Sequence, residues 1–141
     1  MIYVLYGQPA SGKTTLGKLL AERLNTPFLI DGDEFRHMFT NKNYGKEGRE
    51  ENIKNANAVA TYLNKKSSQV VVCLVNPYDY LRKELKNNNQ DQVVEIFLNS
   101  KRELRKEYHV EGFEIGNPHH MINTDQEIEE TWEQLKNILK I

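Results

Sequence analysis

Residues 7–15 have the sequence GQPASGKTT and match the pattern GxxxxGK[ST], which is typical of loops that bind nucleoside triphosphates. A glycine-rich turn aims successive backbone N–H groups at phosphate oxygens, and the dipole of the following helix adds to the attraction. Lys13 would reach the β- and γ-phosphates, Thr14 would place its hydroxyl on a bridging Mg²⁺, and Thr15 would add a second hydroxyl. The alternative is an ordinary strand-to-helix turn with a surface lysine. The predicted triphosphate contacts are Gly7, Gln8, Pro9, Ala10, Ser11, Gly12, Lys13, Thr14 and Thr15.

Triphosphate binding alone does not identify the reaction. A GTPase would need a guanine-selective segment such as NKxD after a late strand, and the sequence contains none, so ATP is the predicted donor with Mg²⁺. A kinase for a small molecule needs a group that orients or deprotonates the attacking hydroxyl, and cations that hold an anionic acceptor. Residues 29–36, LIDGDEFR, offer two carboxylates and an arginine after a short apolar run. We therefore expect the acceptor site there.

Three segments follow the loop in a recognisable order: IDGDEFRHMF from residue 30, REENIK from residue 49 and VNPYDYLR from residue 75. They resemble the DGDxxR, RxENIRR and SPYxxxR segments of the adenylylsulfate kinase family. The resemblance implies a P-loop kinase fold. It also implies transfer of the ATP γ-phosphate to the 3′-hydroxyl of adenosine 5′-phosphosulfate, a step of sulfate activation. Members of this family often pair as dimers, so a homodimer is an expectation.

The two carboxylates take their predicted roles from this resemblance. Asp33 matches the candidate catalytic base beside the accepting hydroxyl, and Asp31 matches a carboxylate that supports Mg²⁺ or the attacking group. The predicted catalytic residues are thus Lys13, Asp33 and Asp31, and the predicted metal ligands are Thr14 and Asp31. Carboxylates at the carboxyl end of a strand lie where open α/β sheets bind ligands. A DGD tripeptide taken alone can also be a simple turn.

Further matched residues are predicted to contact the acceptor. Arg36 and Arg49 match arginines that clamp the phosphosulfate, an anion that suits a planar guanidinium; solvated surface charges are the alternative. Phe35 is predicted to stack on the adenine, with a place in the core as the alternative. Asn52 and Arg82 match polar contacts, with a helix cap or an exposed helix position as alternatives. The predicted acceptor set is Asp33, Phe35, Arg36, Arg49, Asn52 and Arg82.

The sequence also departs from the family pattern. Asn76 stands where the family usually has a serine, which excludes a phosphoserine intermediate there and leaves direct in-line transfer. A lysine-rich lid, approximately DPKGLYKKA, is replaced by residues 108–118, in which Glu111 stands roughly where a lysine is expected. Loss of these cations weakens stabilisation of the transferred phosphoryl group. The candidates to replace them are Lys101, Arg102, Arg105 and Lys106; a solvated helical face balanced by Glu103 and Glu107 is the alternative.

Other functions stay open at the level of sequence. The shortened lid makes another nucleoside-phosphate acceptor credible, for example a cytidine-diphosphate conjugate. A polynucleotide-end kinase would need a basic groove studded with aromatic residues, which the balanced charge argues against. A non-catalytic ATP-binding module would bind ATP yet release no ADP.

The elements that carry these residues follow from hydrophobic patterning. Buried strands are predicted at 2–6, 27–30, 69–75, 93–98 and 120–123. Segments of helical period alternate with them, and a Thr124–Glu127 capping box is predicted to begin the last helix. The predicted fold is α/β: a P-loop NTPase fold of three αβα layers, with a five-stranded parallel sheet flanked by helices.

Composition sets the outer limits. The 141 residues suit a single kinase domain over 1–141, and 19 basic against 20 acidic residues give no reason to expect nucleic acid or an anionic membrane as partner. The longest apolar run, 70–75, is too short to span a bilayer, so we expect a soluble cytoplasmic protein. The one cysteine, Cys73, lies in that run and is expected to be a small buried residue.

Overall fold

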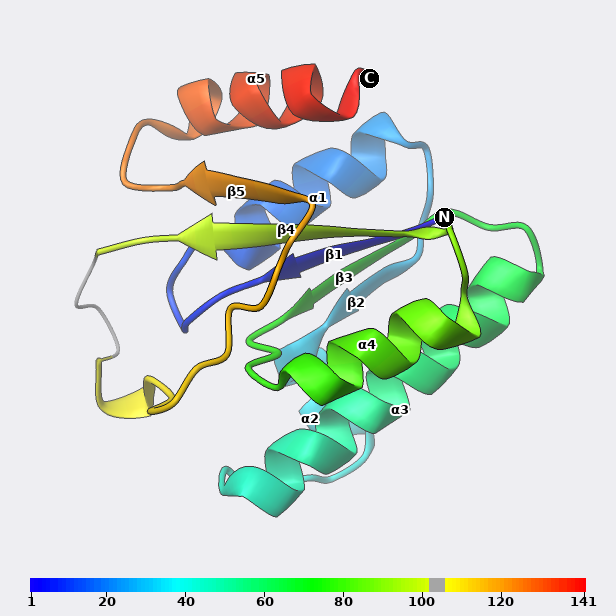
Figure 1. The fold of residues 1–141 in the computed structure, drawn as a ribbon, viewed down its shortest axis with the longest axis vertical. Coiled ribbons are helices and arrows are strands. Elements are labelled where there is room, and N and C mark those ends of the chain that lie inside the picture. The colour runs from blue at the N-terminus through cyan, green and yellow to red at the C-terminus, as the bar shows by residue number, and fades with distance from the viewer. Residues whose placement is uncertain (102–105) are drawn as a thin grey trace.

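The described residues, 1–101 and 106–141 of a computed structural model, form a parallel sheet of five strands in the order β2-β3-β1-β4-β5 (Figure 1). The strands are β1 (Ile2–Tyr6), β2 (Leu29–Asp31), β3 (Val70–Leu74), β4 (Val93–Asn99) and β5 (His120–Asn123). All five lie where the sequence predicts them. β2 begins later than residue 27, because Pro27 has no N–H to give to a neighbouring strand.

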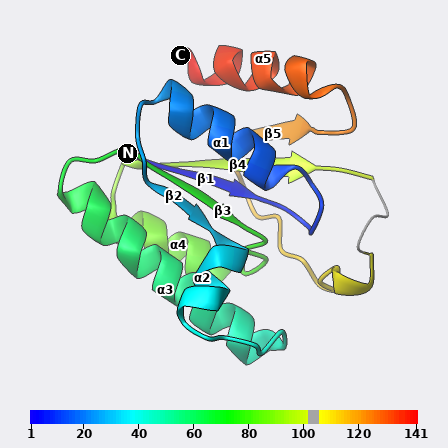
Figure 2. The ribbon, with the colours of Figure 1, turned by 180° about the vertical axis from the view of Figure 1, so that it is seen from behind.

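Helices cover both faces of the sheet, which confirms the predicted three layers (Figures 1 and 2). The first helix, α1 (Lys13–Arg23), lies with α5 (Ile128–Leu139) on one face. The longest helix, α3 (Lys46–Lys65), and α4 (Asp79–Asn88) cover the other face. The short α2 (Gly32–Met38) follows β2 and packs against α3. A 3-10 turn, η1, spans Lys106–Tyr108. No helix within the described ranges is long and apolar enough to cross a membrane.

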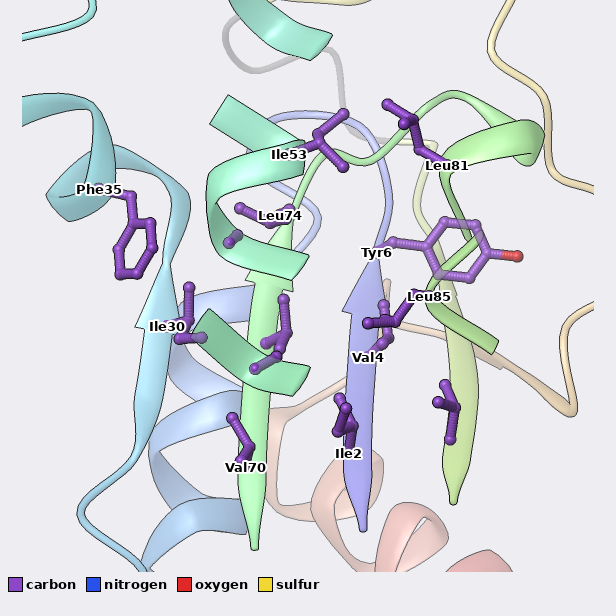
Figure 3. Packing of buried hydrophobic residues seen from close by; sticks show 14 of the residues in the cluster. Ile2, Val4, Tyr6, Ile30, Phe35, Ile53, Val70, Leu74, Leu81 and Leu85 are labelled. Atoms are coloured by element: carbon purple, nitrogen blue, oxygen red, sulfur yellow. The ribbon is translucent and has the colours of Figure 1, made fainter. Parts of the chain in front are cut away.

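Each inner strand sends alternate side chains into two hydrophobic clusters. Val70, Val72 and Leu74 of β3 join the cluster under α3 and α4 (Figure 3), while Val71 and Cys73 face α1. Because both faces are covered, the strand is apolar throughout rather than alternating. Each fully buried Val or Leu contributes roughly 1.5–3 kcal/mol, so the strands form a rigid frame for the loops at their ends.

The predicted capping box at the start of α5 is wrong. The helix begins at Ile128 with Glu127 in the N-cap position, and no side chain caps it. Residues before it serve another purpose: the Asp125 carboxylate accepts hydrogen bonds from the Ser100 hydroxyl at 2.7 Å and from the Lys101 N–H at 2.6 Å. Asp125 therefore ties the loop after β5 to the loop after β4, and the helix starts only beyond this connection.

The carboxyl ends of the strands define the functional edge of the sheet. β3 pairs in parallel with both β1 and β2, so the segments that follow these three strands emerge side by side. They carry the glycine-rich loop, the two carboxylates and the NPY turn. Ligands of open α/β sheets bind at such edges.

Candidate functional site

A cleft of about 680 Å³ opens at this edge of the sheet. It joins the glycine-rich loop to the segment after β2, to the first turns of α3 and to the segment after β3. Eleven residues predicted from the sequence line it: Pro9, Ala10, Gly12, Lys13, Thr14, Thr15, Asp31, Asp33, Arg36, Arg49 and Asn52. The structure therefore brings most of the predicted donor and acceptor residues into one space.

The glycine-rich loop needs its glycines for steric reasons. Gly12 has a φ of 92°, a region that favours glycine, and it directly precedes α1. A Cβ on Gly7 would lie 2.6 Å from the Leu98 carbonyl oxygen, so only glycine fits at the end of β1. The loop thus reaches the first turn of α1, where backbone N–H groups lack helical partners and attract anions.

Lys13 is held at the mouth of this loop. Its ammonium donates hydrogen bonds to the carbonyls of Gly7 at 3.0 Å and Gln8 at 2.9 Å, and to the Ser11 hydroxyl at 3.2 Å. These bonds place one positive charge over the loop, which is where the β- and γ-phosphates of a nucleotide would need it.

Thr14 and Asp31 form a pair of oxygen ligands beside the loop. The Thr14 hydroxyl donates to Asp31 Oδ1 at 3.2 Å, and both residues line the cleft. Mg²⁺ usually takes one or two protein oxygens and completes its octahedron with water and substrate phosphates, so this pair fits a nucleotide-bound Mg²⁺. Among the described residues there is no group of three or more His, Cys, Asp or Glu for a metal held by the protein alone.

The part of the cleft that was predicted to hold the acceptor is lined by Arg36 and Arg49. Burial lowers the pKa of Arg36; the neighbouring Tyr44 and Asp33 raise it, while the charge of Arg49 lowers it. Tyr44, Asp33 and Arg49 thus each lie within electrostatic reach of Arg36. Two guanidinium groups next to a carboxylate suit an anionic acceptor whose hydroxyl must lose a proton.

Tyr44 is an aromatic residue of the cleft that the sequence interpretation missed. Its side chain is 59% exposed, it lines the cleft, and the Arg36 guanidinium lies 4.3 Å from the centre of its ring. Phe35 was predicted to stack on the acceptor's base, but it is buried among core residues and contacts Phe39 at 5.6 Å between ring centres. The sequence offered one signal: a lone aromatic in an Asn- and Lys-rich loop, five residues before Arg49.

Asn52 and Arg82 occupy different environments, although both were predicted to contact the acceptor. Asn52 lines the cleft and donates to the Gly32 carbonyl at 3.3 Å, which ties α3 to the turn after β2. Arg82 is only 1% exposed and is not among the residues that line the cleft. Its guanidinium donates to the Asn76 carbonyl at 2.5 Å and lies 3.4 Å from the Glu95 carboxylate. Arg82 is therefore neither a cleft residue nor an exposed helix residue.

Cys73 lies directly behind the loop. Its thiol is buried and donates to the Lys13 carbonyl at 3.4 Å, and burial raises its pKa to about 12. A Cβ on Gly17 would collide with this sulfur, so α1 and β3 approach closely here. A thiol with such a pKa is not a nucleophile near neutral pH, and the environment matches the small buried residue expected from the sequence.

The segment in the place of the family's lid contributes Tyr108 and Val110 to the cleft, which the sequence analysis did not assign. Two residues of the basic cluster proposed to replace the lid, Arg102 and Arg105, lie outside the described residues. The substitution of lid charges by this cluster stays a prediction.

Comparisons with known proteins begin with a family model. The family model described as adenylylsulphate kinase matches residues 1–134. The chain is similar to the cytidine diphosphoramidate kinase of Campylobacter jejuni, with 35% identity over 91 residues, which cover 59% of this chain and 54% of that protein. It is also similar to the adenylyl-sulfate kinase of a Picosynechococcus species, with 34% identity over 111 residues, or 75% of this chain and 62% of that protein. The matches thus span between half and two thirds of the length of these curated relatives.

A solved structure supports the fold. The Mycobacterium tuberculosis APS kinase, determined in complex with AMPPNP and APS, superposes with a TM-score of 0.77 over 99% of this chain and 97% of that chain. The identity is 20%, so this likeness shows the shared fold alone.

Proposed function

The chain belongs to the adenylylsulphate kinase family, and from this premise we propose that it is an ATP-dependent kinase that phosphorylates the 3′-hydroxyl of adenosine 5′-phosphosulfate. One observation carries the proposal: a single cleft is lined by the triphosphate loop, by the Thr14–Asp31 pair and by the Asp33–Arg36–Arg49 group. A donor bound by the first two would direct its γ-phosphate toward an acceptor bound by the third.

Each part of the cleft has a task in this reaction. The loop N–H groups and Lys13 bind the β- and γ-phosphates, and Thr14 and Asp31 would hold Mg²⁺, which neutralises phosphate charge when bound. Asp33 accepts the proton of the attacking hydroxyl, while Arg36 and Arg49 hold the phosphosulfate in place. Tyr44 offers its exposed ring to the base.

The transfer is direct. Asn76 lines the cleft where the family usually has serine, and a carboxamide cannot form the phosphoester that a serine hydroxyl could. The γ-phosphoryl group therefore passes from ATP to the acceptor hydroxyl in one step, with the proton moving to Asp33.

A second acceptor class is favoured by particular residues. Asn76 and residues 108–118, which replace the lysine-rich lid, both depart from the adenylylsulfate kinase pattern, and a relative with 35% identity is named a cytidine diphosphoramidate kinase. The paired arginines and the Tyr44 ring suit any nucleotide with an anionic tail. Cytidine-diphosphate conjugates are therefore the second candidate acceptors.

A direct assay separates the candidates. Purified protein is incubated with Mg²⁺-ATP and, in separate reactions, adenylylsulfate, cytidine diphosphoramidate or a short oligonucleotide, and ADP release is followed. We expect ADP release with adenylylsulfate well above the rate without acceptor, and loss of most turnover in Lys13→Ala. Release only with the cytidine conjugate would select the second candidate. ATP binding without ADP release for any acceptor would indicate a non-catalytic module.

Assembly and location belong to the same proposal. We infer a single domain over residues 1–141, since both hydrophobic clusters flank one sheet. We also infer that the protein is cytoplasmic, where ATP is available. A homodimer is expected from the family resemblance, and light scattering in solution tests it.

A further inference from the structure

The phosphate loop carries a side chain that its phosphate chemistry does not require. Gln8 donates from Nε2 to the Val110 carbonyl at 2.9 Å, and the Val110 N–H donates to Gln8 Oε1 at 2.9 Å. This reciprocal pair joins residues 102 positions apart in the chain. It satisfies both groups of one carboxamide and both groups of one backbone residue, as a strand neighbour would.

Val110 belongs to a segment that we call the strap, residues 108–116. Its far end is fixed independently of Gln8: the Tyr6 hydroxyl donates to the Ile115 carbonyl at 2.6 Å, and the Phe113 ring stacks on that of Tyr6 at 6.3 Å between centres. The Glu114 N–H donates to the Pro77 carbonyl at 2.9 Å. The strap is thus attached at two places, and Gln8 provides the attachment on the phosphate loop.

Gln8 fixes the part of the strap that faces the nucleotide side of the cleft. Tyr108 and Val110 line the same cleft as Lys13 and Thr14, and Val110 is 7% exposed. Gly112, next along the strap, has a φ of 67° and would meet no atom within 4 Å if it carried a Cβ. The strap therefore has free space around Gly112 and is closely packed at Val110. Its position over the loop thus depends on the two hydrogen bonds between Gln8 and Val110.

The strap has to act through its position rather than its charge. Residues 108–116, YHVEGFEIG, contain no Lys or Arg, in contrast to the lysine-rich lid of the family. A segment without cations stabilises a triphosphate chiefly by covering it and excluding water from the phosphates. For that purpose its distance from the loop must be fixed.

We propose that Gln8 is a positioning residue that holds Tyr108 and Val110 against the phosphate loop, so that bound ATP is covered and shielded from water. The inference rests on the proposed function only in that the cleft binds ATP; it does not depend on the acceptor. Phosphate contacts in such loops come from backbone N–H groups, which leaves the Gln8 side chain free for this role.

The test compares Gln8→Met with Gln134→Met. Methionine keeps the length of glutamine but makes neither hydrogen bond, and Gln134 bonds only to Gln126 in the described structure, on α5. We measure Mg²⁺-ATP affinity by calorimetry and ATP hydrolysis without acceptor. We expect Gln8→Met to weaken ATP binding about three- to tenfold and to raise hydrolysis without acceptor, with Gln134→Met like wild type. A lower melting temperature with unchanged affinity and hydrolysis would overturn the positioning role.

A second measurement uses wild-type protein and does not depend on a variant that folds. Amide hydrogen exchange of residues 108–111 should slow when Mg²⁺-AMPPNP is added, because a strap that contacts bound nucleotide is held more tightly. Unchanged exchange with saturated nucleotide overturns the inference. If ATP binds and the strap is protected, but the γ-phosphoryl group is transferred to no acceptor, the proposed kinase function is overturned and this inference stands. No nucleotide binding at all would overturn both.

Discussion

Two carboxylates separated by a single glycine meet different surroundings in the cleft. Asp31 ends β2 and accepts a hydrogen bond from Thr14 beside the phosphate loop. Asp33 stands in the first turn of α2, is exposed, and contributes to the charge around Arg36. These surroundings support the proposed roles of Asp31 at the metal and of Asp33 at the acceptor hydroxyl, whereas the alternative interpretation of the sequence was a simple turn.

The base role of Asp33 leads to a kinetic prediction. Asp33→Asn keeps size and polarity but accepts a proton far less readily, so we expect kcat to fall roughly 10²- to 10⁴-fold with acceptor KM little changed. Steady-state kinetics with both substrates varied measure this. Glu34→Gln, the neighbouring exposed carboxylate that does not line the cleft, is the control and should resemble wild type. A rise in acceptor KM alone would make Asp33 a binding residue.

The proposal that Tyr44, and not Phe35, stacks on the base of the acceptor is also testable. Stacking of a base on an aromatic ring contributes about 1–3 kcal/mol, so Tyr44→Ala should raise acceptor KM at least about fivefold, while Tyr44→Phe should stay close to wild type. ATP KM should not change in either variant. Phe35→Leu should lower the melting temperature and leave acceptor KM unchanged, because Phe35 packs in the core. The opposite assignment, with acceptor KM raised only in Phe35→Leu, would restore the original sequence prediction.

At the scale of elements, the connection between α2 and α3 presents Tyr44 to the cleft, beside Arg36 of α2. Asn41 and Asn43 build it: the Asn41 carboxamide donates to the Gly48 carbonyl at 2.7 Å, and Asn43 Oδ1 accepts the Gly45 N–H at 2.8 Å. Arg36 donates to the Asn43 carbonyl at 2.9 Å. Arg36, on α2, thus anchors the loop that carries the Tyr44 ring.

Gly48 shows how tightly this loop packs on α3. A Cβ there would collide with the Asn43 carbonyl, so Gly48→Ala must push the loop away. Inside a helix, Gly→Ala normally stabilises by about 1 kcal/mol, whereas here we expect a loss of about 1–3 kcal/mol together with a higher acceptor KM. Denaturant unfolding and steady-state kinetics measure the two effects.

The sign of the change in unfolding free energy caused by Gly48→Ala shows whether the loop packs against Gly48. Ala58→Gly at an exposed position of the same helix calibrates the helix propensity, and it should cost about 1 kcal/mol without a kinetic effect. Stabilisation by Gly48→Ala with normal kinetics would mean that the loop is not held by this contact.

The elements themselves were largely predictable, because a strand buried on both faces leaves an apolar run and a helix leaves a 3.6-residue period. The start of α5 was not. Thr124 and Glu127 have the spacing of a capping box, yet Asp125 is bound to Ser100 and Lys101, which come from a distant part of the chain. The core position of Phe35 could not be chosen over its alternative for a similar reason, since whether a helical aromatic faces the core or the cleft depends on what packs against it.

At the scale of the molecule, parallel pairing explains why the convergence of these residues could be predicted and the position of the strap could not. Strands that all run the same way deliver their following loops to one edge, so Lys13, Asp31 and Asn76 meet there whatever the details of packing. The strap reaches the same edge from beyond β4 and is held by Gln8, Tyr6 and Arg82 through its backbone carbonyls. Contacts through the backbone leave no residue pattern in the strap, and the one aromatic contact, Phe113 on Tyr6, has no partner nearby in sequence, so the position of the strap could not be predicted.

Arg82 carries the last prediction, which concerns the stability of the whole fold. Its guanidinium lies 3.4 Å from buried Glu95 and 4.4 Å from the centre of the Tyr6 ring, and it donates to the Asn76 carbonyl. It therefore links α4, β4 and β1 to the turn after β3. Arg82→Met would leave Glu95 with only the Lys86 ammonium at 2.6 Å as an ionic partner among the described residues, and the Asn76 carbonyl without this donor.

Removal of one partner of a buried ion pair destabilises a protein by about 3–5 kcal/mol. Because Lys86 still pairs with Glu95, we expect Arg82→Met to lower the free energy of unfolding by about 3 kcal/mol, the low end of this range. Equilibrium unfolding in urea measures this, and kinetics taken well below the variant's melting temperature should show acceptor and ATP KM values like wild type. Lys83→Met is the control, because Lys83 is 66% exposed and water screens its pair with Asp79 at the surface, so its loss should change stability little. If Arg82→Met instead kept its stability and lost acceptor affinity, Arg82 would contact the acceptor after all, and its burial between α4 and β4 would have to give way when the acceptor binds.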